Sequence, residues 1–165
     1  HRDRSLREFT KKLVALRAAH PALRRHTFFR GRHRTGLPLA SDLPDVTWFR
    51  PDGEEMQMAD WNAPDAHALA FFVNGEAIGA RDRYGQPIVD DSFYVMLVAG
   101  HGTTDFRLPD RIGPGPWMVA VDTSHALEPG ACIVAIPDTL PLEAPAVRVL
   151  QSSRSRVSML PPAPA

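Results

Sequence analysis

The spacing of hydrophobic residues predicts one helix at the start of the chain. Within residues 5–20, SLREFTKKLVALRAAH, large apolar side chains recur every three or four positions, which is typical of one apolar helix face. Ser5 and Glu8 have the spacing of a capping box, so the helix is expected to begin there. Pro21 disfavours a helical conformation at the residue before it, so the helix should end at residue 20. The apolar positions are Leu6, Phe9, Leu13, Val14 and Leu16.

From residue 26 onward, short apolar and aromatic runs alternate with turn signals such as PDG, NG, YGQP and GPGP. This pattern predicts a mainly β chain, folded as an antiparallel β-sandwich of about eight strands behind the single amphipathic helix. The sixteen prolines also favour strands and turns over a helical bundle. The runs are HTFFR, VTWFR, HALAFFVN, SFYVMLVAG, TTDFRLP, PWMVAVDT, ACIVAIP and VRVL.

Several of these runs are apolar at successive positions, as in AFFV and CIVAI. A strand with one solvated face would instead alternate between apolar and polar residues. The runs therefore predict strands that are covered on both faces, or covered by a neighbouring domain.

The 165 residues suit one domain with an appendage. We expect the helix to occupy residues 1–20, the sandwich residues 21–150, and a flexible tail rich in Ser, Arg and Pro residues 151–165. The helix has an apolar face but is followed by no second helical pattern. The chain also begins with His1 rather than Met, so we expect a piece of a longer protein.

The net charge is zero, but it is unevenly distributed. Residues 1–34 carry 11 Lys and Arg against Asp3 and Glu8, whereas the rest carries 8 basic and 17 acidic side chains. A basic segment can indicate nucleic-acid binding, but no nucleic-acid motif surrounds it. The favoured interpretation is a basic helix face lying against an acidic body. Cys132, the single cysteine, excludes an internal disulfide and is expected to be a packed thiol.

No residue pattern indicates catalysis or metal binding. Adjacent carboxylates, Glu54–Glu55 and Asp90–Asp91, point to opposite faces of an extended segment, so neither forms the acid and base couple of a glycosidase. Asp90 and Asp91 are expected to organise a turn before a strand. The seven histidines lack ligand spacing, and the Ser124–His125 neighbours are attributed to chance. We predict no catalytic residue, no metal site and no cofactor.

Three tryptophans could stack on sugar rings. Trp48 and Trp117 lie inside strand-like runs, so we expect them in the core. Trp61 lies in a polar loop between Asp60 and Asn62. It is the one candidate substrate-binding residue, although packing of the loop onto the sandwich is the favoured interpretation.

Taken in order, LREFTKKLVALRAAHPALRR, FFRGR, PDVTWFRPDGEEMQMADW, ALAFFVNG and VDDSFYVML resemble the C-terminal portion of bacterial glycogen debranching enzymes. These enzymes form the isoamylase-type branch of the α-amylase superfamily. The resemblance spans roughly residues 5–122, and the stretch from Trp48 to Trp61 is its most specific part. It departs at LVAGHG, where the family often has an Asn.

The resemblance implies that residues 1–20 are the last helix of a (β/α)₈ barrel that is missing here. In that family the catalytic carboxylates lie on barrel strands, so none is carried over to this chain. The implied reaction of the whole enzyme is retaining hydrolysis of α-1,6-glucosidic branch linkages in glycogen or limit dextrin, in the cytoplasm and without a cofactor. The implied partner is the enzyme's own barrel.

Three functions remain open at this point. The first is a non-catalytic accessory sandwich of a debranching enzyme. The second is an independent carbohydrate-binding module with solvent-exposed tryptophans. The third is a nucleic-acid or protein-interaction domain that binds through basic residues 24–34.

Overall fold

The computed structural model describes residues 2–31, 43–113, 115–133 and 139–152. One α-helix, α1 (Arg2–Ala19), comes first within these ranges, followed by eight strands. Short 3-10 helices interrupt the order at η1 (Pro21–Leu23), η2 (Asp60–Asn62) and η3 (Asp110–Ile112). The strands are β1 (Val46–Phe49), β2 (Ala68–Val73), β3 (Ser92–Val98), β4 (Thr103–Phe106), β5 (Trp117–Asp122), β6 (Cys132–Ile133), β7 (Leu140–Glu143) and β8 (Ala146–Ser152).

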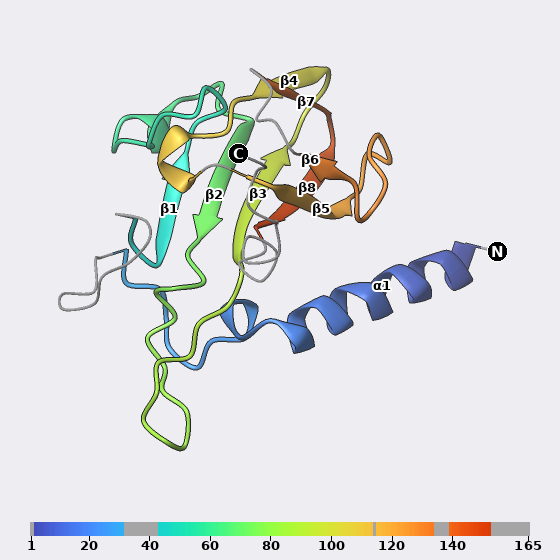
Figure 1. Cartoon of the computed structure of the whole chain (residues 1–165). Helices are drawn as coiled ribbons and strands as arrows, with labels where there is room; N and C mark the ends of the chain where they lie inside the picture. The colour runs from blue at the N-terminus through green and yellow to red at the C-terminus, as the bar shows by residue number, and fades with distance from the viewer. Residues whose placement is uncertain (1, 32–42, 114, 134–138, 153–165) are drawn as a thin grey trace, which may run out of the picture.

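Six strands form one sheet in the order β1-β2-β3-β8-β5-β6, and β4 and β7 form a second, smaller sheet. Every pairing between these strands is antiparallel. The mainly β fold expected from the sequence is confirmed. Figure 1 shows the strands gathered into one body, with α1 projecting away from it.

The main core lies between the two sheets. One face of the large sheet contributes Phe49, Phe72, Tyr94 and Leu150, and the small sheet contributes the equivalent inward side chains of β4 and β7. Trp117 is fully buried there, as its strand-like setting predicts. We call this the inner face of the large sheet and its opposite side the outer face.

Helix α1 ends at Ala19, which confirms the stop expected before Pro21. It begins at Arg2, however, so Ser5 lies inside the helix and the capping box predicted at Ser5 and Glu8 is wrong. The basic side chains that follow in α1, including Lys11 and Lys12, are exposed to solvent. The expected packing of a basic helix face on an acidic body is therefore also wrong.

One predicted strand is absent from the structure, and one observed strand is not predicted. Residues 26–30 form bends and irregular backbone, with Phe28 95% exposed. Strand β7, with the sequence LPLE, was not expected. Cys132 is exposed rather than packed, and Trp48 lies on the outer face, 37% exposed, rather than in the core. The prediction for the tail concerns residues 153–165, which lie outside the described residues.

Candidate functional site

The outer face of the large sheet is apolar along its centre. The antiparallel register places Leu69, Leu97 and Val147 in one row across β2, β3 and β8. The next row on this face contains Phe71, Val95 and Val149. Since side chains alternate between the two faces of a strand, the uninterrupted apolar runs of the sequence correspond to apolar residues on both faces.

One end of the outer face is closed by the segment that follows α1. Ala22 of η1 packs with Val73 and Phe93 in a second, smaller cluster, and Leu16 and Leu23 lie against it. This cluster stands where β2 ends and β3 begins. The start of the chain is therefore attached to the sandwich at that end of the sheet.

Hydrogen bonds fix the same junction. The His20 Nδ1 atom lies 2.9 Å from one Asp90 carboxylate oxygen, and the Ala22 backbone N–H donates to the other oxygen at 2.9 Å. The Gln151 side chain donates to Asp91 at 2.6 Å. Asp90 also accepts from the Asp91 backbone N–H, so the two carboxylates fix the irregular segment that leads into β3, where a turn is expected from the sequence but none forms.

His20, Asp90 and Asp91 together place possible metal-ligand atoms within 4.8 Å of one another. The two Asp90 oxygens already accept three hydrogen bonds, from His20, Ala22 and Asp91. A cation would have to displace these contacts. The cluster is therefore a structural junction in its present form.

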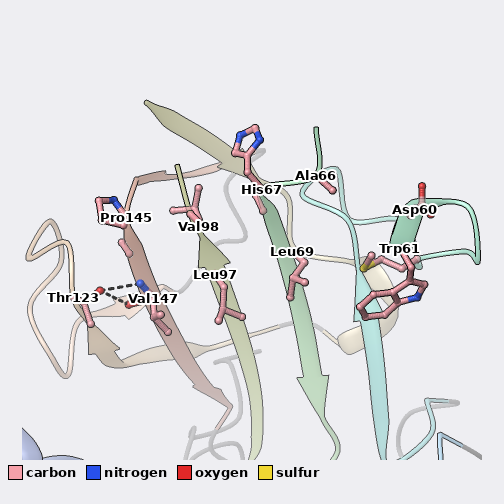
Figure 2. A pocket seen from close by; sticks show the side chains of 14 residues that line it. Asp60, Trp61, Ala66, His67, Leu69, Leu97, Val98, Thr123, Pro145 and Val147 are labelled. Atoms are coloured by element: carbon pink, nitrogen blue, oxygen red, sulfur yellow. Dashed lines mark hydrogen bonds between the residues drawn. The ribbon is translucent and has the colours of Figure 1, made fainter. Parts of the chain in front are cut away.

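A groove of about 570 Å³ occupies the other end of the outer face. Figure 2 shows Leu69, Leu97 and Val147 side by side along its floor, with Trp61 and Asp60 at one side. His67 stands at its upper edge in that view. The groove includes the one sequence-predicted site residue, Trp61.

Trp61 is held in place by other aromatic rings. Its indole meets Trp48 edge-on at a centroid distance of 5.3 Å, and Trp48 packs against Phe71 at 5.0 Å. Such aromatic pairs contribute about 0.5–1.5 kcal/mol beyond their buried area. Trp61 nevertheless remains 49% exposed. The loop is thus tied to the outer face, as expected, while one aromatic surface stays in contact with solvent.

The loop before Trp61 is organised by charged side chains. Arg50 and Asp52 form a bidentate contact, with the shortest N–O distance 2.8 Å, and Arg50 also lies 3.7 Å from Asp60. Hydrogen bonding from Arg50 lowers the pKa of Asp52 despite partial desolvation. The backbone N–H of Gln57 donates to Asp60 at 2.7 Å. These contacts fix the chain on both sides of Met56 and Trp61.

A buried ion pair underlies the side of the groove formed by β5 and β8. Arg148 and Asp122 approach to 2.9 Å, with side chains only 2% and 0% exposed. Burial alone would raise the pKa of Asp122, but hydrogen bonds from Ser124 and the charge of Arg148 lower it below its usual range. Ser124 thus serves this pair, through a 2.6 Å hydrogen bond from its hydroxyl to Asp122.

The sequence predicts Trp61 at this site but does not predict Trp48 beside it. The sequence predicts Trp48 in the core because it lies in a strand; alternation places it on the face opposite to Phe49 but does not say which face is covered. The uninterrupted apolar runs of the sequence indicate an apolar outer face, but they do not single out Leu69, Leu97 and Val147.

No helix among the described residues is long and apolar enough to cross a membrane.

The model of the isoamylase C-terminal domain family matches residues 45–159. A "Glycogen operon protein GlgX homolog" of Mycobacterium tuberculosis is 31% identical over 154 residues, which are 92% of this chain and 21% of that protein. An isoamylase of Flavobacterium sp. is 33% identical over 129 residues, 78% of this chain and 15% of that protein. The chain thus spans about a fifth or less of the length of the curated relatives it matches.

Proposed function

This chain belongs to the isoamylase C-terminal domain family, and we propose on that premise that it is the non-catalytic accessory domain of a longer glycogen debranching enzyme. The whole enzyme would hydrolyse α-1,6-glucosidic branch linkages in glycogen or a limit dextrin, with retention through a glycosyl–enzyme intermediate. The accessory domain would stabilise the catalytic barrel. A cytoplasmic setting is proposed with it, because one relative is named a glycogen operon protein.

The exposed apolar stripe of α1 carries this proposal. Leu6 and Val14 are 64% and 62% exposed, and Leu13 is 38% exposed. Most of the stability of a helix in a protein comes from packing of its apolar face rather than from intrinsic propensity. About four fifths of the length of the relatives lies outside the matched region. We propose that the barrel of the longer enzyme packs on the apolar stripe, with α1 as the last helix of that barrel.

The junction behind α1 suits such a role. His20 and Ala22 are both bonded to Asp90, and Arg25 forms a largely buried ion pair with Asp45 at 2.9 Å. A connection fixed by several polar contacts sets the direction in which a helix leaves a domain. Docking of a barrel along α1 would then also cover the nearby end of the outer face.

Three acidic side chains are engaged in structural contacts, which supports a non-catalytic role. A glycosidase needs two carboxyl groups about 5–10 Å apart across a bound sugar. Glu55 is bonded to Arg111 at 3.0 Å, Asp90 organises the junction, and Asp122 is buried against Arg148. We therefore expect this chain alone to be inactive, and a debranching assay beside the full-length enzyme checks this. Activity of the isolated chain would refute the assignment.

Substitution of Leu6 by Glu in the full-length enzyme tests the docking of α1. A charge in a buried apolar contact without a partner should destabilise the assembly by about 2–4 kcal/mol, seen as a lower melting temperature and faster proteolysis between the domains. Lys12→Glu is the control, since it places the same acidic side chain at an exposed position of the same helix outside the surface lined by Leu6 and Val14. Equal melting of the two variants would contradict docking through the apolar stripe.

A further inference from the structure

We propose that the groove beside Trp61 binds a linear stretch of α-1,4-linked glucan. The inference deepens the proposed function and rests on it, because a glucan is a relevant ligand only if the whole enzyme acts on one. The groove would hold an outer chain of the polysaccharide at a distance from the catalytic centre. Its recognition elements are an aromatic platform, an apolar floor and a polar edge.

The aromatic platform is held in a fixed orientation before any ligand binds. Trp48 supports the Trp61 ring at 5.3 Å, and Phe71 supports Trp48 in turn. The η2 turn that carries Trp61 is closed by a hydrogen bond from the Asn62 side chain to the Met58 carbonyl oxygen at 3.2 Å. A ligand that stacks on Trp61 would lose little affinity to ordering of the loop, because the loop is already ordered by these contacts.

The groove combines apolar and polar surfaces in the way that a sugar chain requires. Pyranose rings present C–H groups on their faces and hydroxyl groups around their edges. Leu69 and Leu97 offer apolar contact on the floor, while Asp60 and His67 line the same groove. The His67 Nδ1–H donates to the Asp65 carbonyl oxygen at 2.8 Å, so its Nε2 atom is the one left to accept from a hydroxyl group in the neutral ring.

The groove lies at the end of the outer face away from α1. Helix α1 joins the sandwich beside Val73 and Phe93, whereas the groove lies beside Ala68 and Val98. The two ends of β2 are five residues apart, or about 17 Å at 3.3 Å per residue. The exposed Trp61 ring beside Asp60 and His67, rather than this distance, favours a sugar chain as the occupant of the groove.

Hydrogen–deuterium exchange of the wild-type full-length enzyme tests the site without any substitution. Saturation with maltoheptaose, a linear α-1,4 glucan, should slow backbone exchange in the loop at residues 56–66 and at His67. The hairpin around Tyr84, which lies outside the groove lining, serves as the internal control and should not change. Unchanged exchange at residues 56–67 under saturating maltoheptaose would overturn the proposal.

Variants of the full-length enzyme provide the second test. Loss of the stacking surface in Trp61→Ala should weaken retention on a glycogen affinity gel about fivefold, whereas Trp61→Phe should preserve most of it. Tyr84→Ala, at another exposed aromatic residue, is the matched control and should leave retention unchanged. Retention of Trp61→Ala equal to that of the wild type would also overturn the proposal.

The two tests separate this inference from the proposed function. Loss of docking in Leu6→Glu together with unchanged glycogen retention in Trp61→Ala would refute the glucan groove and leave the accessory role standing. Reduced retention in Trp61→Ala, with melting of Leu6→Glu equal to that of its Lys12→Glu control, would support the groove and refute docking through α1. In that case, the alternative of an independent carbohydrate-binding module would be favoured.

Discussion

Asp122 carries its charge into the interior of the sandwich, and several donors compensate for its burial. Arg148 donates through Nε at 3.0 Å, Ser124 through its hydroxyl at 2.6 Å, and the Leu127 backbone N–H at 3.0 Å. Arg148 also donates to the Pro141 carbonyl oxygen at 2.9 Å. Because Pro141 belongs to β7, this network links the small sheet to the large one.

Replacement of Asp122 by Asn should therefore be costly. It leaves the charge of Arg148 buried and unpaired, which typically lowers the free energy of unfolding by about 3–5 kcal/mol. Asp52→Asn, at the solvent-exposed pair with Arg50, is the control and should cost about 1 kcal/mol or less. Urea unfolding at pH 7 measures both, and similar losses in the two variants would contradict the importance given to the buried pair.

The lowered pKa of Asp122 also predicts how stability depends on pH. A carboxyl group whose pKa is lower in the folded state stabilises that state above its unfolded pKa of about 3.9. This contribution is lost as the pH falls through the folded pKa. The difference in stability between wild type and Asp122→Asn should accordingly shrink below about pH 4. An equal difference at pH 7 and pH 3 would show that the charge of Asp122 is not its cause.

At the scale of elements, the connection between α1 and the sandwich depends on Asp90. Asp90→Ala removes the acceptor of both His20 and the Ala22 backbone N–H, and one buried donor without a partner costs about 1–3 kcal/mol. We expect faster hydrogen exchange at residues 20–23, with little change in β5. Asp82→Ala, in the exposed hairpin turn, is the control. Unchanged exchange at residues 20–23 would contradict a fixed connection.

Local pattern predicted strands correctly where a neighbouring strand pairs with the run. Strands β2 and β3 are long and centrally placed, and their apolar runs were recognised. The run HTFFR has the aromatic residues of a strand, but Phe28 is exposed and no neighbouring strand pairs with this segment among the described residues. Propensity for strands reflects fit to a partly buried surface, and here that surface is missing.

Strand β7 has a pairing partner, but its sequence argues against a strand, so it is not predicted. Its sequence LPLE contains Pro141, and proline within an apolar run argues against a central strand. The structure accommodates it in the two-stranded sheet with β4, where Leu140 and Leu142 point inward and Pro141 outward. Likewise, the exposure of Trp48 depends on which face of the sheet is covered. That is decided by long-range packing, which a local pattern does not contain.

At the scale of the whole molecule, the two hydrophobic clusters differ in how far they depend on α1. The large cluster is enclosed by both sheets and includes no residue of α1. The small cluster receives Leu16 from α1, but its buried members are Ala22, Val73, Ile78 and Phe93. The sandwich should therefore hold its structure when α1 has no partner, and the helix should be the first part to unfold.

Truncation before His20 tests this division. The shortened chain keeps the contacts of His20 and Ala22 to Asp90, so it should still melt cooperatively, within about 5 °C of the full 165-residue chain. Truncation before Phe28 is the contrasting variant, because it also removes Ala22 and the Arg25–Asp45 ion pair. That deletion opens the small cluster, so its melting temperature should fall well below that of the first. A non-cooperative transition after removal of α1 alone would mean that the helix is part of the sandwich fold, and the interpretation of α1 as an element of a preceding barrel would then lose its structural basis.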